Sequence, residues 1–180
     1  SDPAPDSVVV DTVAGVRCWF FNEMIDSIAV HFDSVQGDPS YILQGLQMVR
    51  PESGLVYHAV GVNGAATKSF LRSENFVEQG KYVAPDLVIF GLGINDAYKP
   101  NNAWFPKEYG ARYDTLVGWY REFNPECEFI FMTNNDSYYR RRIPNEHGLD
   151  VVEQMKLLSE RHDAALWDLF GVMGGLNSVA

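Results

Sequence analysis

The sequence has 180 residues, of which 46% are hydrophobic and 21% charged, with a formal net charge of −10 and a pI of about 4.7. This length suits one domain, or one domain with a small appendage, and the composition is that of an ordinary globular protein. The acidic balance argues against nucleic acid or an anionic membrane surface as the main partner, because both need clustered Lys and Arg. No apolar run approaches the roughly 18 residues of a membrane-spanning helix.

The N-terminal part has the pattern of short strands. Its first residues, SDPAPDSVVV, are polar and Pro-rich and indicate a linker, which leaves room for an export signal that has been removed. Gly, Asp, Pro and Ser then separate the apolar stretches VVV, VRCWFF, SIAVHF (27–32) and YILQGLQMV (41–49). Residues 1–54 are therefore predicted to form a small β-rich module, a partial sandwich, with a short helix over 40–49 as the alternative for the last stretch.

The two cysteines, Cys18 and Cys127, each lie among strand-like apolar residues. That setting favours two buried thiols over a disulfide, although the sequence leaves both possibilities open. Cysteine usage therefore does not fix the redox compartment.

From residue 55 the pattern changes to alternating strands and helices. The expected strands are LVYHAV (55–60), DLVIF (86–90), CEFIFMT (127–133) and AALWDLF (164–170). Helical spacing of apolar residues predicts helices over 66–82, with an interruption near Ser73-Glu74, and over 106–123 and 149–162. Residues 55–180 are therefore predicted to form an α/β domain, a three-layer flavodoxin-like parallel sheet with both faces covered by helices.

Three of the predicted strands end in loops that are rich in Gly, Asn and Asp. These loops are GVNGA (61–65), GLGIND (91–96) and TNNDS (133–137), and chain direction places all three at the same edge of the sheet, where open parallel sheets bind ligands. Neutral backbone N–H groups and an Asn amide, aimed at one point, stabilise an oxyanion better than a phosphate. Neither G-x-G-x-x-G nor a phosphate-binding loop is present, so no nucleotide cofactor is expected.

GVNGA and GLGIND resemble the second and third sequence blocks of the SGNH (GDSL-like) hydrolases, which are three-layer α/β esterases and lipases. The resemblance covers roughly residues 55–175, and its most specific part is the G-x-N-D block, residues 93–96. It implies an oxyanion hole formed by the Gly64 backbone N–H and the Asn95 side-chain amide. YHAVGVNGA and TNNDSYYRRR look more like bacterial secreted or periplasmic members, in which a β-sandwich module accompanies the hydrolase core. A periplasmic or extracellular location is the corresponding expectation.

The family's other two blocks are the G-D-S of the nucleophile and the D-x-x-H of the catalytic histidine. No histidine of this sequence has Asp three residues before it, as the contexts of His31, His58, His147 and His162 show. We therefore expect the catalytic His and its Asp to lie beyond Ala180 or to be absent, and the domain to be incomplete.

HFDSVQG (31–37) imitates the nucleophile block, since Asp33-Ser34 follow an apolar stretch and Gly64 comes 30 residues after Ser34. Phe32 replaces the small residue that a nucleophile on a sharp, strained turn usually needs. Ser34 therefore stays a candidate nucleophile, but the favoured alternative is a turn residue of the β-rich module. In that case we expect the nucleophile in a G-D-S block upstream of residue 1.

Several further residues have both a functional and a structural interpretation. Asp96 is either a catalytic or substrate-binding carboxylate or, by preference, a brace for the Asn95 loop. Asn63, Asn134 and Asn135 are predicted to contact substrate, with a plain Asx-turn over Asn134–Asp136 as the alternative. Arg140–Arg142 suit either an anionic part of a substrate or a solvated loop that partners the acidic surface. For three other side chains the structural role is favoured. His58 is expected to be a core or edge histidine of a strand, and His147 is expected in a solvent-facing loop. Trp104 is expected in the core and not as a platform for a sugar.

Together these features predict a serine esterase domain that deacylates small-molecule or carbohydrate esters and is inactive as an isolated chain. The alternative is a non-catalytic glycan-binding module on a hydrolase scaffold. No His, Cys or Asp cluster has metal-ligand spacing, so no metal is expected. The sequence does not set the substrate, the oligomeric state or the function of the β-rich module.

Overall fold

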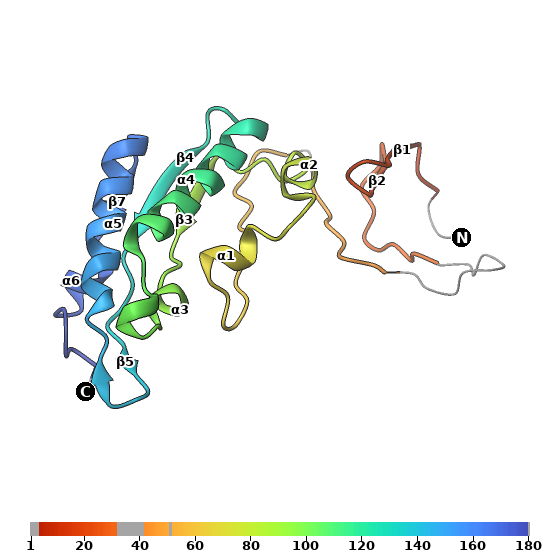
Figure 1. The fold of residues 1–180 in the computed structure, drawn as a ribbon. Coiled ribbons are helices and arrows are strands. Elements are labelled where there is room, and N and C mark those ends of the chain that lie inside the picture. Colours follow the sequence, from red (N-terminus) through yellow and green to blue (C-terminus); the bar gives the residue numbers. More distant parts are fainter. Residues whose placement is uncertain (1–3, 32–41, 51, 180) are drawn as a thin grey trace. The chain divides into compact units, whose positions relative to one another are not determined.

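A computed structural model of the chain describes residues 4–31, 42–50 and 52–179 and divides into two compact units, Ser1–Val60 and Gly61–Ala180 (Figure 1). In the first unit, β1 (Ser7–Asp11) and β2 (Val16–Phe20) form an antiparallel hairpin in which Ser7 lies opposite Phe20. Its turn is held by the Asp11 carboxylate, which accepts hydrogen bonds from the backbone N–H groups of Val13 and Ala14 at 3.0 and 2.9 Å.

The other strands predicted before residue 61 do not form in the described residues. Residues 27–31 and 42–49 have no regular secondary structure, so both the strands and the alternative helix at 40–49 are wrong there. LVYHAV (55–60) also forms no strand, and Leu55 and Tyr57 are 94% and 81% exposed. An alternating apolar run becomes a strand only where a neighbour pairs with it and covers it, and no described strand does so here. The division into a 1–54 module and a 55–180 domain stays a prediction.

The second unit is built on a three-stranded parallel sheet. Its strands are β3 (Leu87–Phe90), β4 (Glu128–Met132) and β7 (Ala165–Trp167), in the order β3-β4-β7. In register, Phe90 lies beside Phe131, and Phe131 lies beside Leu166. The predicted α/β class with a parallel sheet is thereby confirmed.

The helices of the second unit follow the predicted order. They are α1 (Thr67–Phe70), α2 (Phe76–Gly80), α3 (Ile94–Ala97), α4 (Pro106–Phe123), α5 (His147–His162) and α6 (Leu169–Val172), with a 3-10 turn, η1, at Asn101–Ala103. The helix expected over 66–82 is interrupted as predicted, α4 has the predicted bounds, and α5 begins two residues earlier than predicted. The strand expected over 164–170 ends at Trp167 because the Asp168 carboxylate caps α6, accepting from the Gly171 N–H at 3.1 Å. None of the described helices is both long and apolar enough to cross a membrane.

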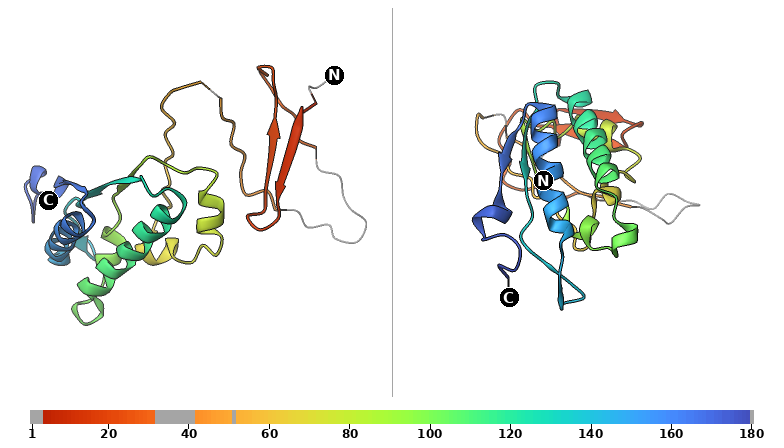
Figure 2. Two further views of the ribbon diagram at one scale, coloured as in Figure 1. Left: turned by 90° about the horizontal axis from the view of Figure 1, so that it is seen from above. Right: turned by 60° about the vertical axis from the view of Figure 1, so that its left-hand side comes forward.

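One face of the sheet carries the core. Helices α4 and α5 lie side by side over this face (Figure 2). Phe90 of β3 packs against Phe131 and against Tyr113 of α4, with ring centroids 5.5 and 5.1 Å apart. The fully buried side chains of the two helices recur at helical spacing and include Tyr109, Tyr113, Leu116, Val117, Val151, Met155 and Leu158. Tyr120 and Val152, which share this spacing, are only partly buried.

The opposite face is open in the described residues. Leu87, Ile89 and Trp167 point to this side and are 49%, 56% and 52% exposed. The expectation that helices cover both faces therefore holds for one face only, because no described helix packs on the other. In the described residues the domain therefore has two layers, the sheet and the helices on one of its faces.

This one-sided burial predicts unequal effects of truncating neighbouring strand residues. Phe131→Ala removes a side chain that is 0% exposed and should lower the free energy of unfolding by about 3–5 kcal/mol. Ile89→Ala, on the open face, should cost less than about 1 kcal/mol, because its side chain loses little burial. Urea denaturation measures both, and similar losses for the two variants would show that the open face is covered in solution.

Candidate functional site

The three polar loops predicted to converge do meet at the carboxyl edge of the sheet. Gly93, at the entry to α3, leaves no room for a side chain. A Cβ there would lie 2.4 Å from the Asn134 amide nitrogen and 2.7 Å from the Tyr109 hydroxyl. The loop after β3 and the loop after β4 are therefore in direct contact, and the glycine of the G-x-N-D block is required by that close approach.

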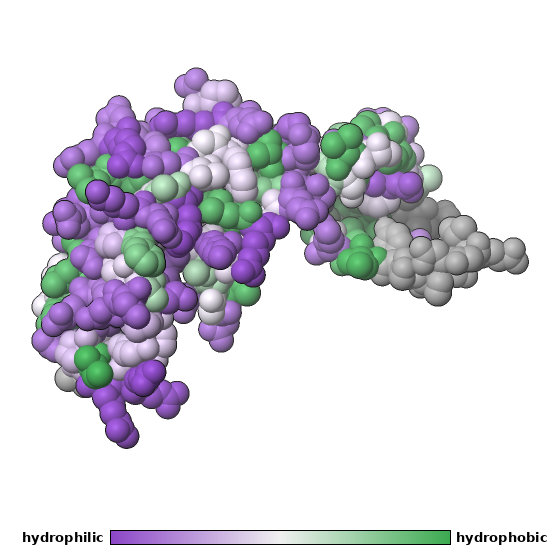
Figure 3. Space-filling view, in the orientation of Figure 1, coloured by the Kyte–Doolittle hydropathy of each residue, from purple (hydrophilic) through white to green (hydrophobic). Residues whose placement is uncertain are grey.

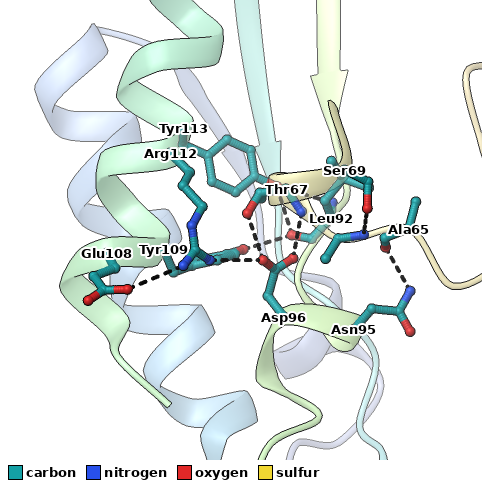
Figure 4. A network of polar contacts seen from close by, with 11 residues as sticks. Ala65, Thr67, Ser69, Leu92, Asn95, Asp96, Glu108, Tyr109, Arg112 and Tyr113 are labelled. Atoms are coloured by element: carbon teal, nitrogen blue, oxygen red, sulfur yellow. Dashed lines mark hydrogen bonds and ion pairs between the residues drawn. The ribbon is translucent and has the colours of Figure 1, made fainter. Parts of the chain in front are cut away.

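Two tyrosines of α4 hold the peptide at Leu92. The hydroxyls of Tyr109 and Tyr113 each donate to the Leu92 carbonyl oxygen at 2.7 Å, and the Tyr113 hydroxyl accepts from the Leu92 N–H at 3.1 Å. Burial raises the pKa of both tyrosines well above its ordinary value, so both hydroxyls stay protonated and remain donors. The start of the Asn95 loop is thus fixed to the longest helix of the domain (Figure 4).

The Asp96 carboxylate ties this loop to the segment after GVNGA. It accepts hydrogen bonds from the Thr67 backbone N–H at 2.9 Å and from the Thr67 hydroxyl at 2.6 Å (Figure 4). The Arg112 guanidinium lies 3.4 Å away on the other side. Asp96 and Thr67 are 4% and 0% exposed, so these charge-assisted bonds are shielded from water. This arrangement favours the brace interpretation of Asp96, which joins the Asn95 loop to the first residue of α1.

Gly64 and Asn95 lie on adjoining loops. The Asn95 amide nitrogen donates to the carbonyl oxygen of Ala65 at 2.8 Å, next to Gly64 in the chain. Gly64 has a φ of +76° at the third position of a turn closed by a 3.0 Å bond from the Ala65 N–H to the Val62 carbonyl, as a type II turn requires. Gly64, Asn63 and Asn95 are all exposed. A type II turn therefore brings the Gly64 peptide beside the Asn95 amide on an accessible surface.

The loop after β4 is more buried. Asn134 is 7% exposed against Gly93, and the Asn135 amide donates to the Asp136 carbonyl at 2.8 Å. Asp136 is 2% exposed; one carboxylate oxygen accepts from the Ser137 N–H at 2.8 Å, and the other has no partner among the described residues. Neither of these bonds is that of an Asx-turn, in which a side-chain oxygen accepts from the N–H two residues on, and the loop lies beside the Asn95 loop.

The other candidates named from the sequence have separate outcomes. Ser34 falls outside the described residues. His58 is exposed and is not in a strand, so its expected strand position is wrong. His147 is not in a solvent-facing loop: it begins α5 with a side chain 14% exposed, its ring centroid 5.7 Å from that of Trp104. Asp150 lies 3.6 Å from the His147 ring and accepts from the Trp104 indole N–H at 2.7 Å.

Sequence reasoning missed this cluster of His147, Asp150 and Trp104. The spacing of three residues between His147 and Asp150, which places both on one side of α5, could have indicated it. It also missed the bond of 2.8 Å between His162 and Asp114, which joins α5 to α4. The described residues contain no group of three His, Cys, Asp or Glu side chains that suits a metal ion. Both cysteines are free thiols, buried at Cys127 and partly exposed at Cys18.

The Asp96 brace predicts a large loss of stability on truncation. Asp96→Ala leaves the N–H and hydroxyl of Thr67 buried without an acceptor and should lower the free energy of unfolding by about 3 kcal/mol. Thr67→Val should cost about 1.5 kcal/mol, and the double variant less than the sum. Glu108→Ala, which removes only an exposed ion pair with Arg112, is the matched control and should change stability by less than about 0.5 kcal/mol. Equal losses for Asp96→Ala and Glu108→Ala would contradict the brace.

The buried tyrosines predict a loss of stability at high pH. Folding raises the pKa of both hydroxyls. Their contribution to the free energy of unfolding is therefore complete below the unfolded pKa of about 10 and is lost as the pH rises toward the folded pKa. Above about pH 10 the free energy of unfolding should fall by about 1.4 kcal/mol per pH unit for each tyrosine. Denaturation across this range should give a shallower fall for Tyr113→Phe; an unchanged slope would be evidence against the buried, protonated hydroxyl.

Comparison with known proteins places this site in a family. The sequence profile described as the GDSL-like Lipase/Acylhydrolase family matches residues 26–178. A solved structure described as a peptidoglycan O-acetylesterase in action has a TM-score of 0.56 and 19% identity, over 65% of this chain and 34% of the other. The structure of a candidate acylhydrolase from Bacteroides fragilis NCTC 9343 has a TM-score of 0.50 and 13% identity, over 64% and 56% of the two chains.

At these identities the two structures show a common fold, and the chain spans about a third and just over half of their lengths. A search of curated protein sequences found no match. The profile match covers most of the chain, including both the Gly64 turn and the G-x-N-D block. The chain therefore belongs to the GDSL-like lipase/acylhydrolase family.

Proposed function

We propose that this chain supplies the oxyanion-binding part of a serine ester hydrolase, with the Gly64 N–H and the Asn95 amide as the two donors. The single observation that carries the proposal is the 2.8 Å bond from the Asn95 amide to the Ala65 carbonyl, which holds Asn95 beside the Gly64 turn. This bond uses one N–H of the amide and leaves the other for a ligand. The Gly64 N–H has no acceptor among the described residues.

The proposed reaction is acyl transfer through a serine. The serine Oγ attacks the ester carbonyl while a histidine takes its proton, and the carbonyl oxygen becomes a tetrahedral oxyanion. Gly64 and Asn95 donate to that oxyanion before the alcohol leaves with a proton from the histidine. Water then hydrolyses the acyl-enzyme by the same route. The bonds that Asp96 and Leu92 make keep both donors in place, so that little reorganisation is needed as charge develops.

The proposed substrate class is an acylated carbohydrate. One structural neighbour is described as a peptidoglycan O-acetylesterase, which supports a sugar ester over a long-chain lipid. Asn63, Asn134 and Asn135 are proposed to contact the substrate, as polar side chains on the loops that adjoin Gly64 and Asn95. A periplasmic or extracellular location in a bacterium is part of the same proposal.

The proposed mechanism needs a nucleophilic serine and a histidine in addition to Gly64 and Asn95. The family match begins at residue 26 and so includes Ser34, while the polar partners of His147 and His162 are Asp150 and Asp114. We propose that the isolated chain is inactive and that a G-D-S serine and a D-x-x-H histidine come from other parts of the complete protein. The same lack of an identified serine and histidine beside Gly64 and Asn95 also favours the second candidate function, a glycan-binding module that retains a hydrolase scaffold without catalysis.

The donor role of Asn95 predicts a kinetic effect in the complete protein. Asn95→Ala should lower kcat for an acetyl ester by at least about a hundredfold, because removing one oxyanion donor costs about 3 kcal/mol of transition-state stabilisation. Asn102→Ala, at an exposed site in η1, is the control and should leave kcat unchanged. An Asn95→Ala variant that turns over at the parent rate would reject the role.

Labelling with a serine-directed fluorophosphonate separates the two candidate functions. The complete protein should be labelled if it is an esterase, whereas glycan binding without labelling would favour the non-catalytic module. The isolated 180 residues should show no turnover. Turnover that disappears in Ser34→Ala would instead identify Ser34 as the nucleophile and overturn the proposed origin of the serine.

A further inference from the structure

A basic hairpin stands at the same end of the domain as the Asn95 loop. It is formed by β5 (Tyr138–Tyr139) and β6 (Ile143–Pro144), and we call residues 138–144 the arginine hairpin. Its tip is Arg140-Arg141-Arg142, three exposed residues in a row in a chain with only 14 Lys and Arg against 24 Asp and Glu. In Figure 3 the lower end of the molecule, where Figure 1 draws this hairpin, is strongly hydrophilic.

The turn at the tip has an unfavourable backbone for arginine. Arg140 and Arg141 have φ angles of +51° and +59°, and the Arg142 N–H donates to the Tyr139 carbonyl at 3.2 Å. Two successive left-handed residues define a type I′ turn, whose preferred pair is Asn-Gly. Arginine is less favourable than glycine at each such position, because its Cβ crowds the following carbonyl oxygen. Folding alone therefore does not explain two arginines at these positions.

The hairpin is fixed to the segment that follows Asn95. The Arg140 N–H donates to the Tyr98 hydroxyl at 2.9 Å, and the rings of Tyr98 and Tyr139 lie 4.9 Å apart. At the base of the hairpin, the Asn145 amide donates to the Ala97 carbonyl at 3.3 Å. The arginine tip is therefore held by α3 and the residue after it, only a few residues along the chain from Asn95.

The guanidinium groups lack acidic partners within the described part of the chain. None of the ion pairs there includes Arg140, Arg141 or Arg142, and Arg140 lies over the Tyr139 ring at 5.3 Å. A solvated loop that partners the acidic surface would show such pairs. The tip instead presents planar donor groups that match a carboxylate in bidentate geometry, beside the 43% exposed ring of Tyr98, which offers a stacking surface for a sugar.

We propose that the arginine hairpin binds carboxylate groups of a glycan and so makes the domain selective for acidic over neutral polysaccharides. The proposal rests on the proposed function, in that the glycan is the one whose acyl group reaches Gly64 and Asn95. A carboxylate is the proposed ligand because three arginines make too small a basic patch for a densely charged polymer such as nucleic acid on a chain of net charge −10.

Binding of unesterified oligosaccharides to the complete protein tests the hairpin without requiring catalysis. Oligogalacturonate should bind at least about fivefold more tightly than an oligogalactan of the same length, and added salt should reduce that difference. The informative variant is Arg140→Asn/Arg141→Gly, which removes two charges and installs the pair that a type I′ turn prefers. It should lose the preference for oligogalacturonate while its melting temperature stays equal or rises, which separates binding from folding.

Lys107→Gln/Lys156→Gln, which removes two exposed charges from α4 and α5, is the matched control and should retain the preference. An equal loss in this control, parent-like binding by the Asn-Gly variant, or tighter binding of inorganic polyphosphate than of oligogalacturonate would each overturn the proposal. A protein that hydrolyses no ester but binds oligogalacturonate through the hairpin would refute the esterase alone. A protein that hydrolyses acetyl esters and ignores the carboxylate would refute the hairpin alone.

Discussion

The arrangement of the site depends on the two hydrogen bonds that join Asp96 to Thr67. They connect segments 29 residues apart in the chain, and both ends are buried. The bond between Asn95 and Ala65, at an exposed position, joins the same two loops, and α1 also packs on α4 and the core. A buried carboxylate with two good donors is costly to leave unpaired, so this contact strongly selects one relative position of the two loops.

Around that contact, the sheet and α4 act as a rigid support. The aromatic side chains of β3, β4 and α4 fill the covered face, and Tyr109 and Tyr113 extend from this core to the Leu92 peptide. Asn95 therefore lies at the end of a short chain of contacts that begins in the best-packed part of the domain. The arginine hairpin joins the same support through Tyr98. The same core would thus position both the proposed oxyanion donor Asn95 and the arginine hairpin, while both stay accessible.

Much of this framework could be predicted because its signals are local. The 18-residue α4 has an uninterrupted helical pattern that begins at Pro106, and β3 and β4 are short, nearly continuous apolar runs. LVYHAV has the same local pattern as a strand and yet forms none, because pairing depends on residues far away in the chain. The convergence of the Gly64 and Asn95 loops was expected from strand direction and motif, although the strand assumed before Gly64 does not form, and the Thr67 and Tyr113 bonds have no sequence signature. Arg140–Arg142 were recognised as a basic cluster, but their hairpin was not predicted, because an Arg-Arg pair does not indicate a type I′ turn.

The central claim is that Gly64 and Asn95 together hold the oxyanion of an ester hydrolase. A crystal structure of the complete protein with a phosphonate covalently bound to its serine would test this most directly, because the phosphonyl oxygen occupies the position of the oxyanion. The account predicts that this oxygen lies about 2.7–3.1 Å from both the Gly64 nitrogen and the Asn95 amide nitrogen. An adduct whose oxygen contacts neither group, or no adduct at any serine, would contradict it.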